Sequence, residues 1–464
     1  MRMYIIGAGV IGIALLVTVV WLWRNPLPSP EKPYNLIVIS IDTLRVDHLG
    51  LYGYSRDTSP NLDAFSKEAL VFDQAIAQAP FTLSSHASIL TSQYPSLHGL
   101  LGLQDTLAPS KLTIAEALSQ YGYQTAAFVG GGDLDHSFSM DQGFSLYIDS
   151  EGSSLSNTIP LAAKWLWLNR GSRVFAYVQG YDVHGPYEKP EPYGKMFTDP
   201  NYAGVLSDTA KYVLNYGSRD QDPKSILDNI KKINGKPVLV EDDGNETPLT
   251  QEDIEYIIAR YDGGIRYTDD LIGGFFDQLQ QMGLYDDSLI IVLAGHGESL
   301  GDDLARQAEP SSSRLFGHGQ VYDELIRAPL LIKVPGLEPA RISSSVQLID
   351  LFPTILDFLG IPQSRELKNN IQGTSMLPLL EGEQERDLDP YAFGEGVGEK
   401  GNQRYVRTSS WKLIVRGESA SELYDLQSDP GETVNVIGER QEIAGMMKEA
   451  FSDWLFSNLK KKTE

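Results

Sequence analysis

Short, continuous apolar runs alternate with longer amphipathic stretches along most of the chain. The apolar runs are rich in β-branched residues, which suits strands buried on both faces, and they cover residues 35–41, 125–129, 174–179, 288–294 and 328–334. Apolar residues at three- to four-residue spacing predict helices at 112–121, capped by Ser110, and at 251–282, with a break around 267–270. Strands that alternate with long helices predict an α/β fold, a sandwich around a largely parallel sheet.

Two regions outside this alternation have patterns of their own. Residues 188–252 carry no long apolar pattern and are rich in Asp, Asn, Lys, Tyr and Pro, which predicts an irregular insertion near the mouth of a site. Past residue 386, short runs at 404–407, 411–415 and 422–426 predict antiparallel strands, and a closing helix follows at 441–459. We therefore expect a main domain at 35–385 and a small-sheet subdomain at 386–464.

The amino end carries the longest apolar run. Residues 3–23 contain no charge over 21 positions, and at a rise of about 1.5 Å per residue a helix of this length crosses about 30 Å of hydrocarbon. A cleaved signal peptide is disfavoured because the run ends in Trp-Leu-Trp-Arg-Asn-Pro in place of small residues. We predict a single transmembrane anchor at 3–23, a Pro-rich linker at 24–34 and a soluble domain on the extracytoplasmic side, although the flanking charges leave the orientation open.

Length and composition narrow the class of protein. The 464 residues exceed the length of one typical domain, and 42 % apolar with 22 % charged residues is ordinary globular composition, which excludes wholesale disorder. The formal net charge of −24 makes nucleic acid an unsuitable general partner. There is no cysteine, so disulfides, thiolate metal ligands and cysteine nucleophiles are excluded. Nothing in the pattern specifies an oligomeric state.

Hydroxyl, imidazole and carboxyl side chains collect in the turns at or near the ends of the predicted strands. They are Asp42, Thr82, Ser84, Ser85, His86, Asp182, His184, His296, Glu298 and His318. Four of the chain's seven histidines lie in these turns. Because the carboxyl ends of parallel strands meet at one edge of a sheet, we expect these groups to converge there. A cluster of this kind predicts a reaction centre.

The convergent groups favour metal-assisted group transfer. Asp42 would give an oxygen ligand, and one or more of the histidines a nitrogen ligand, to a single divalent cation. Beside such an ion the hydroxyl of Thr82 loses its proton more readily and becomes a nucleophile. The first amides of the helix after Thr82 suit anionic oxygens, and the remaining histidines suit equatorial oxygens or the leaving group. These ligand types leave zinc, manganese, calcium and magnesium open.

Taken in order, these motifs resemble those of the sulfatase family, a branch of the alkaline phosphatase superfamily. The resemblance runs from Asn35 to about Asn435, in the blocks IDTLRVDHLGLYGYSRDTSPNLDAFSKEALVFDQA, APFTLSSHASILTSQYPSLHG, YDVHGPY, ARYDGGIRYTDDLIG, HGESLGDD, FGHGQVYDELIRAPLLIKVPG, QLIDLFPTILDFLGIP and KLIVRGESASELYDLQSDPGETVN. Eight blocks in family order make the resemblance specific. It implies an alkaline-phosphatase-like α/β core with a large mixed sheet, a small C-terminal antiparallel sheet, and an enzyme that acts on anionic esters.

The resemblance also implies roles at matching positions. The family's metal site matches Asp42, Thr82 and His296. Thr82 corresponds to the family's nucleophile, and His86 stands at the position of an arginine of sulfatases. His184 corresponds to a histidine that contacts the anion or the leaving group, and His318 lies near the position of another substrate-contacting basic residue. The substrate implied is a phosphate or sulfate ester, and the cofactor is one divalent metal ion.

Two departures from the family pattern bear on activity. Sulfatases use a formylglycine aldehyde made from Cys or Ser, whereas the methyl group of Thr82 limits its oxidation to a ketone. Thr82 more closely resembles the unmodified threonine of membrane-anchored phosphoglycerol and phosphoethanolamine transferases. The second departure is Gly295, which replaces the aspartate of the family's Asp-His-Gly metal motif. The carboxylate could come from Glu298, Asp302 or Asp303 if the loop folds back.

Two functions follow from these observations. The first is a membrane-anchored, metal-dependent hydrolase or transferase that acts on phosphate or sulfate esters through Thr82. The second is a catalytically impaired relative that serves as a binding or scaffold protein, since Gly295 removes one metal ligand. In either case we expect specificity to lie in the insertion at 188–248.

Overall fold

The computed structural model describes residues 34–102, 104–207, 226–241, 243–306, 315–380, 389–398, 401–417 and 419–463. The predicted membrane anchor at 3–23 and residues 24–33 of the predicted linker lie outside these ranges. Within the described ranges, no helix is both long enough and apolar enough to cross a bilayer.

An eight-stranded sheet forms the centre of the molecule, in the strand order β13-β2-β12-β9-β1-β5-β3-β4. Its strands are β1 (Asn35–Ile41), β2 (Leu70–Ile76), β3 (Gln124–Phe128), β4 (Leu146–Ile148), β5 (Val174–Gly180), β9 (Ser288–Leu293), β12 (Arg327–Lys333) and β13 (Ala340–Gln347). β12 is antiparallel to both of its neighbours, while the other pairings are parallel. The apolar residues of β1 and β9 are almost fully buried, as expected for strands covered on both faces. The predicted large, mixed and mostly parallel sheet is confirmed.

The apolar pattern misses three strands of this sheet, β2, β4 and β13. In β2 the apolar run is interrupted by Asp73, which forms a 2.7 Å salt bridge with Arg341, and by Gln74, which accepts a hydrogen bond from Arg407. β13 is an edge strand with three consecutive serines. Asp73 and Gln74 hide β2 because the arginines that satisfy them are distant in the sequence. The serines hide β13, and β4 is only three residues long.

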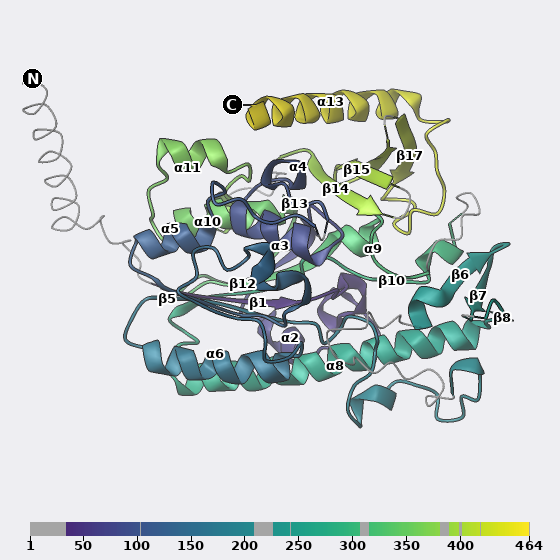
Figure 1. Ribbon diagram of the computed structural model, residues 1–464, viewed down its shortest axis with the longest axis horizontal. Coiled ribbons are helices and arrows are strands. Elements are labelled where there is room, and N and C mark those ends of the chain that lie inside the picture. Colours follow the sequence, from purple (N-terminus) through teal and green to yellow (C-terminus); the bar gives the residue numbers. More distant parts are fainter. Residues whose placement is uncertain are drawn as a thin grey trace, which may run out of the picture.

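Helices cover both faces of the sheet (Figure 1). One face carries α2 (Pro60–Phe65), α6 (Leu155–Asn169) and α8 (Gln251–Gln281), and the other carries α3 (Thr82–Thr91), α5 (Ile114–Gln120) and α10 (Leu351–Phe358). The shorter elements are α4 (Pro95–His98), α9 (Asp323–Ile326), α11 (Arg365–Asn370), α12 (Leu377–Leu380), β10 (Ser299–Leu300) and β11 (Phe316–Gly317). The predicted α/β sandwich is therefore present.

The structure differs from the predicted helices in two places. α8 is continuous from Gln251 to Gln281, with no break at 267–270. Asp269 in that segment is buried and accepts hydrogen bonds from backbone amides at the start of α2, so this polar residue caps another helix and leaves its own intact. α5 begins after Thr113, which forms a capping box, and not after Ser110.

The insertion at 188–252 is less irregular than predicted. Its described part contains a three-stranded antiparallel sheet of β6 (Ile230–Ile233), β7 (Lys236–Val240) and β8 (Glu246–Pro248). Asn234 and Gly235 connect β6 to β7, both with positive φ, which is the Asn-Gly pattern of a type I′ hairpin. This dipeptide is visible in the sequence, but the polar composition around it hides the two short strands that it joins.

A four-stranded antiparallel sheet forms the carboxyl-terminal part of the described chain. Its strands, in order, are β14 (Ala392–Gly398), β15 (Gly401–Arg407), β16 (Trp411–Arg416) and β17 (Ser419–Asp425). α13 (Gln441–Thr463) packs against this sheet, and Trp454 stacks on Phe393 with ring centroids 5.0 Å apart (Figure 1). The predicted small sheet and closing helix are confirmed, whereas the glycine-rich β14 escapes the apolar pattern. The proposed domain boundary at 385 lies outside the described residues.

Candidate active site

The hydroxyl of Thr82, the first residue of α3, lies between a carboxylate and an imidazole. Thr82 Oγ1 donates a hydrogen bond to Asp42 Oδ1 at 3.0 Å and lies 3.1 Å from His296 Nε2. His296 Nε2 and Asp42 Oδ1 are 3.9 Å apart. Thr82 is 1 % exposed, and the other two side chains are fully buried. The structure thus brings together the three groups predicted to share a metal ion.

The order of the strands explains why these residues meet. β1 and β9 are parallel neighbours, so Asp42 after β1 and His296 after β9 leave the sheet at the same edge. Thr82 occupies the first turn of α3, where backbone N–H groups lack partners within the helix. These N–H groups and the helix dipole favour negative charge, so an anionic group beside Thr82 would be stabilised.

Asp42 is a carboxylate in surroundings that disfavour its charge. Burial raises the pKa of Asp42 well above its usual range; the hydrogen bond from Thr82 opposes this shift, and the negative charges of Asp133 and Glu298 add to it. Asp42 Oδ2 has no hydrogen-bond partner among the described residues. A buried carboxylate oxygen without a partner is costly unless a cation or a proton offsets it, so this atom suits a metal ligand.

His296 directs a nitrogen lone pair at the same point. Burial lowers the pKa of His296 well below its usual range, and the nearby His318 adds to the shift. Nδ1–H of His296 donates to the carbonyl of Gly297 at 2.8 Å, so the lone pair of Nε2 faces Thr82. A neutral imidazole held through its other nitrogen is the usual form of a histidine ligand. By the chemistry of their donor atoms, Asp42, Thr82 and His296 therefore fit a divalent ion.

Two further histidines extend from this cluster toward the surface. The ring centroids of His296 and His318 are 4.8 Å apart, and those of His318 and His184 are 5.3 Å apart. His184 Nδ1–H donates to the carbonyl of Gly185 at 2.6 Å, and the His318 side chain is 18 % exposed. His184 and His318, which follow His296 in this row, can contact an anion and exchange protons with it.

Comparison with known proteins agrees with this geometry. The family profile described as "Sulfatase" matches residues 34–361, and the one described as "N-sulphoglucosamine sulphohydrolase, C-terminal" matches residues 312–455. The chain belongs to the sulfatase family. The chain is therefore a sulfatase-like ester hydrolase.

Individual relatives cover nearly the whole chain. An arylsulfatase of Clostridium perfringens is 24 % identical over 458 residues, which cover 88 % of this chain and 91 % of the relative. Arylsulfatase K of Bos taurus is 26 % identical over 462 residues, covering 90 % and 81 %. A phosphonate monoester hydrolase from Silicibacter pomeroyi has a TM-score of 0.67 at 23 % identity, covering 92 % of this chain and 96 % of that one, and shares the fold.

His86, which stands where the sulfatase pattern has an arginine, is held inside the protein. Its Nδ1–H donates to the carbonyl of Thr82 at 2.8 Å, and its Nε2 lies 2.9 Å from Ser40 Oγ. The side chain is fully buried, and burial lowers the pKa of His86 to about 4. With both ring nitrogens bonded within the fold, His86 supports the first turn of α3. The geometry favours this positioning role over the catalytic role expected for this histidine.

The low pKa of His86 leads to a pH-dependent prediction. Between about pH 6.5 and pH 4 the unfolded chain binds a proton at residue 86 and the folded chain does not, so stability falls as the pH falls. His86→Gln removes this component, and the difference in unfolding free energy between wild type and variant is expected to shrink by about 1.4 kcal/mol per pH unit on acidification. Denaturant unfolding across this range is the measurement. Parallel profiles would contradict a neutral, buried His86.

Asp133 lies near the site but is not among the residues predicted from the sequence. It lies in a 3₁₀ turn, Gly132–Leu134, and its charge acts on both Asp42 and His184. The available signal is its place after three glycines at the end of a predicted strand. Asp182 was among the residues predicted at the strand ends. It accepts hydrogen bonds from the backbone amide of Leu155, the first residue of α6, and from the hydroxyl of Ser154 before it, and so caps that helix.

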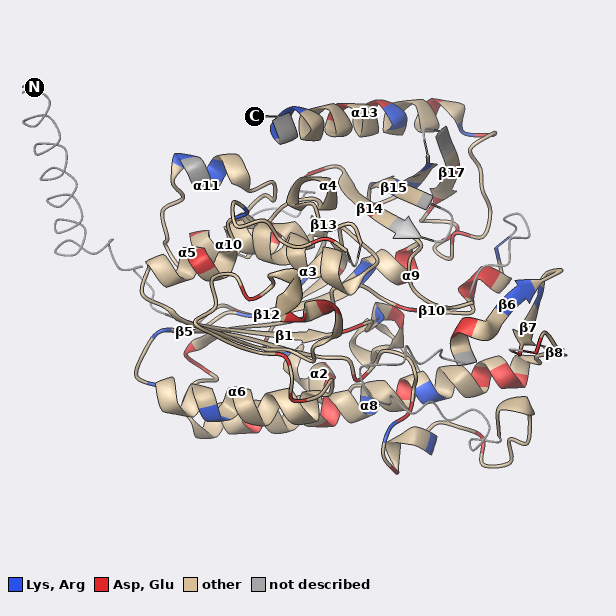
Figure 2. Cartoon of the chain, in the orientation of Figure 1, with Lys and Arg blue, Asp and Glu red and all other residues tan. Residues whose placement is uncertain are grey.

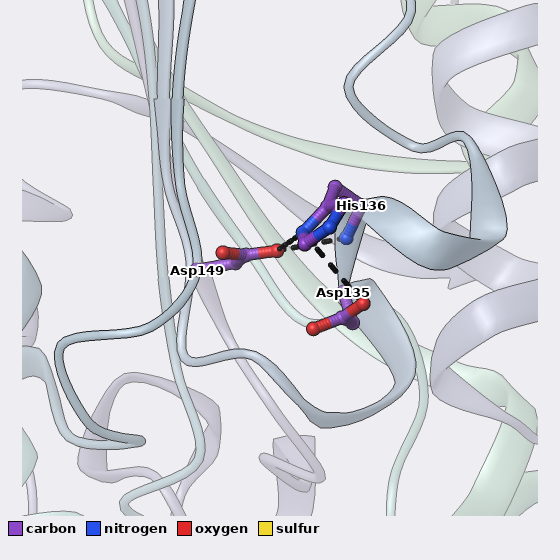
Figure 3. Close-up of side chains that lie close together, drawn as sticks. All are labelled: Asp135, His136 and Asp149. Carbon is purple, nitrogen blue, oxygen red and sulfur yellow. Dashed lines mark hydrogen bonds and ion pairs between the residues drawn. The ribbon is translucent and has the colours of Figure 1, made fainter.

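A separate group of potential metal ligands is Asp135, His136 and Asp149. In the described part of the chain, this is the one His/Asp/Glu cluster whose ligand atoms all lie within 4.8 Å of one another (Figure 3). Asp149 Oδ2 accepts hydrogen bonds from the backbone amide of His136 at 2.8 Å and from its Nδ1 at 2.7 Å. Asp135 accepts a hydrogen bond from the amide of Ser137 in the same turn. These bonds account for the cluster as a brace of an exposed turn.

Proposed function

We propose that this protein cleaves phosphate esters by hydrolysis or transfer, with Thr82 as nucleophile and one divalent cation held by Asp42, Thr82 and His296. The observation that carries the proposal is the position of Thr82 Oγ1, 3.0 Å from Asp42 Oδ1 and 3.1 Å from His296 Nε2. Relatives named arylsulfatase and phosphonate monoester hydrolase support an anionic ester of sulfur or phosphorus. When bound, the cation lowers the pKa of a neighbouring hydroxyl and offsets the charge of the ester.

The threonine at position 82 favours a phosphorus ester over a sulfate ester as the substrate. Formylglycine is an aldehyde, and the methyl group on Cβ of Thr82 prevents an aldehyde from forming there. Ester cleavage through an aldehyde hydrate is therefore closed to this chain. An unmodified hydroxyl can still attack a phosphorus centre and carry the phosphoryl group as an ordinary ester.

The reaction takes two displacements. Thr82 Oγ1 gives its proton to Asp42 Oδ1, the oxygen to which it donates a hydrogen bond, and attacks phosphorus. A new O–P bond forms and the ester O–P bond breaks, so an alcohol leaves and Thr82 carries the phosphoryl group. The leaving oxygen takes its proton from His184 or His318, the imidazoles that border the site. Water, or an acceptor alcohol in a transfer, then gives a proton to that imidazole and attacks phosphorus. The Thr82 O–P bond breaks, and Thr82 Oγ1 takes its proton back from Asp42. The first amides of α3 stabilise the anionic oxygens in both steps.

Attraction of an anion depends on this local centre, because the chain as a whole is strongly acidic. The formal net charge is −24, and acidic residues recur along α8 and in other elements (Figure 2). The helix N-terminus, the cation and the row of imidazoles would supply the opposing positive potential. We therefore expect substrate affinity to fall when the cation is withdrawn.

We further propose that residues 3–23 anchor the domain in a membrane, that 24–34 form the linker and that the domain is extracytoplasmic. Support comes from the 21 uncharged residues and the Pro-rich segment that follows them. The insertion at 188–248, with β6 to β8, is the proposed source of substrate specificity.

Turnover by the full-length protein tests the catalytic proposal. Purified protein is incubated with an aryl phosphate, an aryl phosphonate monoester and an aryl sulfate, with and without added divalent cation, and acid-quenched protein is examined by mass spectrometry. We expect cation-dependent phenol release from a phosphorus ester and a phosphoryl group on Thr82. Phenol release from the aryl sulfate alone would show that the substrates are sulfate esters. Cation binding without turnover of any ester would favour the scaffold function.

A further inference from the structure

The end of α6, just before β5, carries an exposed patch of apolar and basic side chains. Trp167 is 53 % exposed and Leu168 62 %, and no other tryptophan of the described residues is exposed to this extent. The guanidinium of Arg170 lies 4.6 Å from the centroid of the Trp167 ring. A tryptophan paired with a basic residue is typical of the boundary between water and lipid. The exposed residues Lys164, Trp167, Leu168 and Arg170 are called the docking patch below.

The charge of this stretch is opposite to that of the whole chain. No Asp or Glu occurs from residue 152 to residue 181, which contain Lys164, Arg170 and Arg173, whereas the chain has a net charge of −24. The connection from α6 to β5 accordingly carries blue segments in Figure 2. A basic surface is attracted to anionic lipid headgroups, whereas a two-fold contact with a second copy would bring like charges together. The docking patch therefore suits an anionic membrane better than it suits a second copy.

The docking patch lies near the edge of the sheet at which the chain enters β1. The backbone amide of Val174, the first residue of β5, donates to Oδ1 of Asn35, the first residue of β1, at 3.2 Å. The proposed anchor at 3–23 is joined to Tyr34 by residues 24–33, which reach no more than about 40 Å even when fully extended. This edge of the sheet is therefore held close to any bilayer that the anchor enters.

A second basic segment lies at the other end of the molecule, in the hairpin of β6 and β7 (Figure 1). Nζ of Lys232 in β6 donates to the carbonyls of Asp303 and Arg306 at 2.7 and 2.8 Å, so this charge is engaged within the protein. Asp243 and Glu246, which follow β7, are exposed and acidic. None of the exposed large apolar side chains of the described residues lies in this hairpin. The hairpin thus lacks the apolar character of the docking patch, and acidic residues adjoin it.

We propose that the docking patch rests on the anionic headgroups of the membrane that holds residues 3–23. The inference rests on the anchoring part of the proposed function. β1 is 7 residues long, so Asp42 lies about 23 Å from Asn35 at the usual rise of a strand. Contact at the amino-end edge of the sheet turns the carboxyl-end edge, with Thr82, away from the bilayer. The ester then comes from the surrounding solution and not from headgroups of the same leaflet.

Lipid contact in the full-length protein tests this orientation, and the absence of cysteine makes one introduced thiol a specific reporter. Leu168→Cys and, at the other end of the molecule, Lys236→Cys are labelled with bimane. Each is reconstituted in vesicles of phosphatidylcholine and phosphatidylglycerol that contain a nitroxide-labelled lipid. We expect the nitroxide to quench the bimane at position 168 and not at position 236.

Charge reversal tests the role of the basic side chains. Lys164→Glu with Arg170→Glu, added to Leu168→Cys, is expected to lower the ratio of docked to undocked protein by about tenfold or more, because each basic residue near an anionic surface strengthens binding. Omission of phosphatidylglycerol is expected to act in the same direction. Equal quenching with and without the anionic lipid would overturn the proposed anionic partner.

The other outcomes separate this inference from the rest of the proposed function. Vesicle-bound protein with no quenching at 168 would overturn docking and leave the anchor in place. Quenching at 236 in place of 168 would turn the other end toward the bilayer and overturn the orientation. A bimane at 168 that is shielded in detergent, in a particle of twice the mass, would assign the patch to a second copy. Protein that stays in solution would reject both anchor and docking, while turnover of an aryl phosphate would still decide catalysis by Thr82.

Discussion

Replacing Thr82 by alanine is expected to lower kcat for a phosphate ester by about 10⁴-fold or more, because it removes the atom that attacks phosphorus. The side chain is 1 % exposed, and its hydroxyl makes both contacts that define the site, to Asp42 and to His296. The measurement is steady-state turnover of an aryl phosphate by full-length protein saturated with divalent cation.

Two variants separate loss of the nucleophile from loss of structure. Thr82→Ser retains the hydroxyl and is expected to keep turnover within about a hundredfold of wild type, since only the positioning methyl group is lost. Ser84→Ala removes a buried hydroxyl from the same turn, one that donates to the carbonyl of Leu100 at 2.6 Å, and is expected to leave chemistry in place. Undiminished turnover by Thr82→Ala would show that another group attacks the ester.

The sequence predicts those strands of the sheet that consist of continuous apolar residues. β1, β5 and β9 are continuous apolar runs, and each lies in the interior of the sheet. β2 and β13 escaped because Asp73 and Gln74 in β2 are satisfied by arginines far along the chain, and β13 is a serine-rich edge strand. A local sequence pattern contains no information on partners that are distant in the sequence, and β2 depends on such partners.

The candidate site could be predicted as a set of residues, but not as a geometry. Strand ends bring Asp42, Thr82 and His296 together because parallel strands share an edge, and this much follows from the sequence. His86 has the same motif context as the others, yet its ring is turned into the protein by hydrogen bonds to Ser40 and to the carbonyl of Thr82. The direction of a helical side chain depends on space left by other elements, which no single-sequence pattern contains.

Replacing Gly295 by aspartate restores the family motif in the sequence, but it is expected to destabilise this protein by about 3 kcal/mol or more. The new Cβ would lie 2.7 Å from Cε1 of His86, and that ring is held on both sides by Ser40 and Thr82. The added carboxylate would also lie in a buried turn, where a charge without a partner is costly. The measurement is the free energy of unfolding in the presence of a chelator.

A double-mutant cycle tests whether the contact with His86 is the cause. His86→Ala opens the space that the aspartate needs, so the double variant is expected to recover about 1–3 kcal/mol relative to the sum of the single changes. Gly171→Asp is the matched control, since a Cβ there meets nothing within 4 Å, and its effect is expected to stay within about 0.5 kcal/mol. A Gly295→Asp variant as stable as this control would contradict the packing argument. A measured coupling would instead show that Gly295 and His86 are two halves of one rearrangement, in which the imidazole occupies the place of the aspartate.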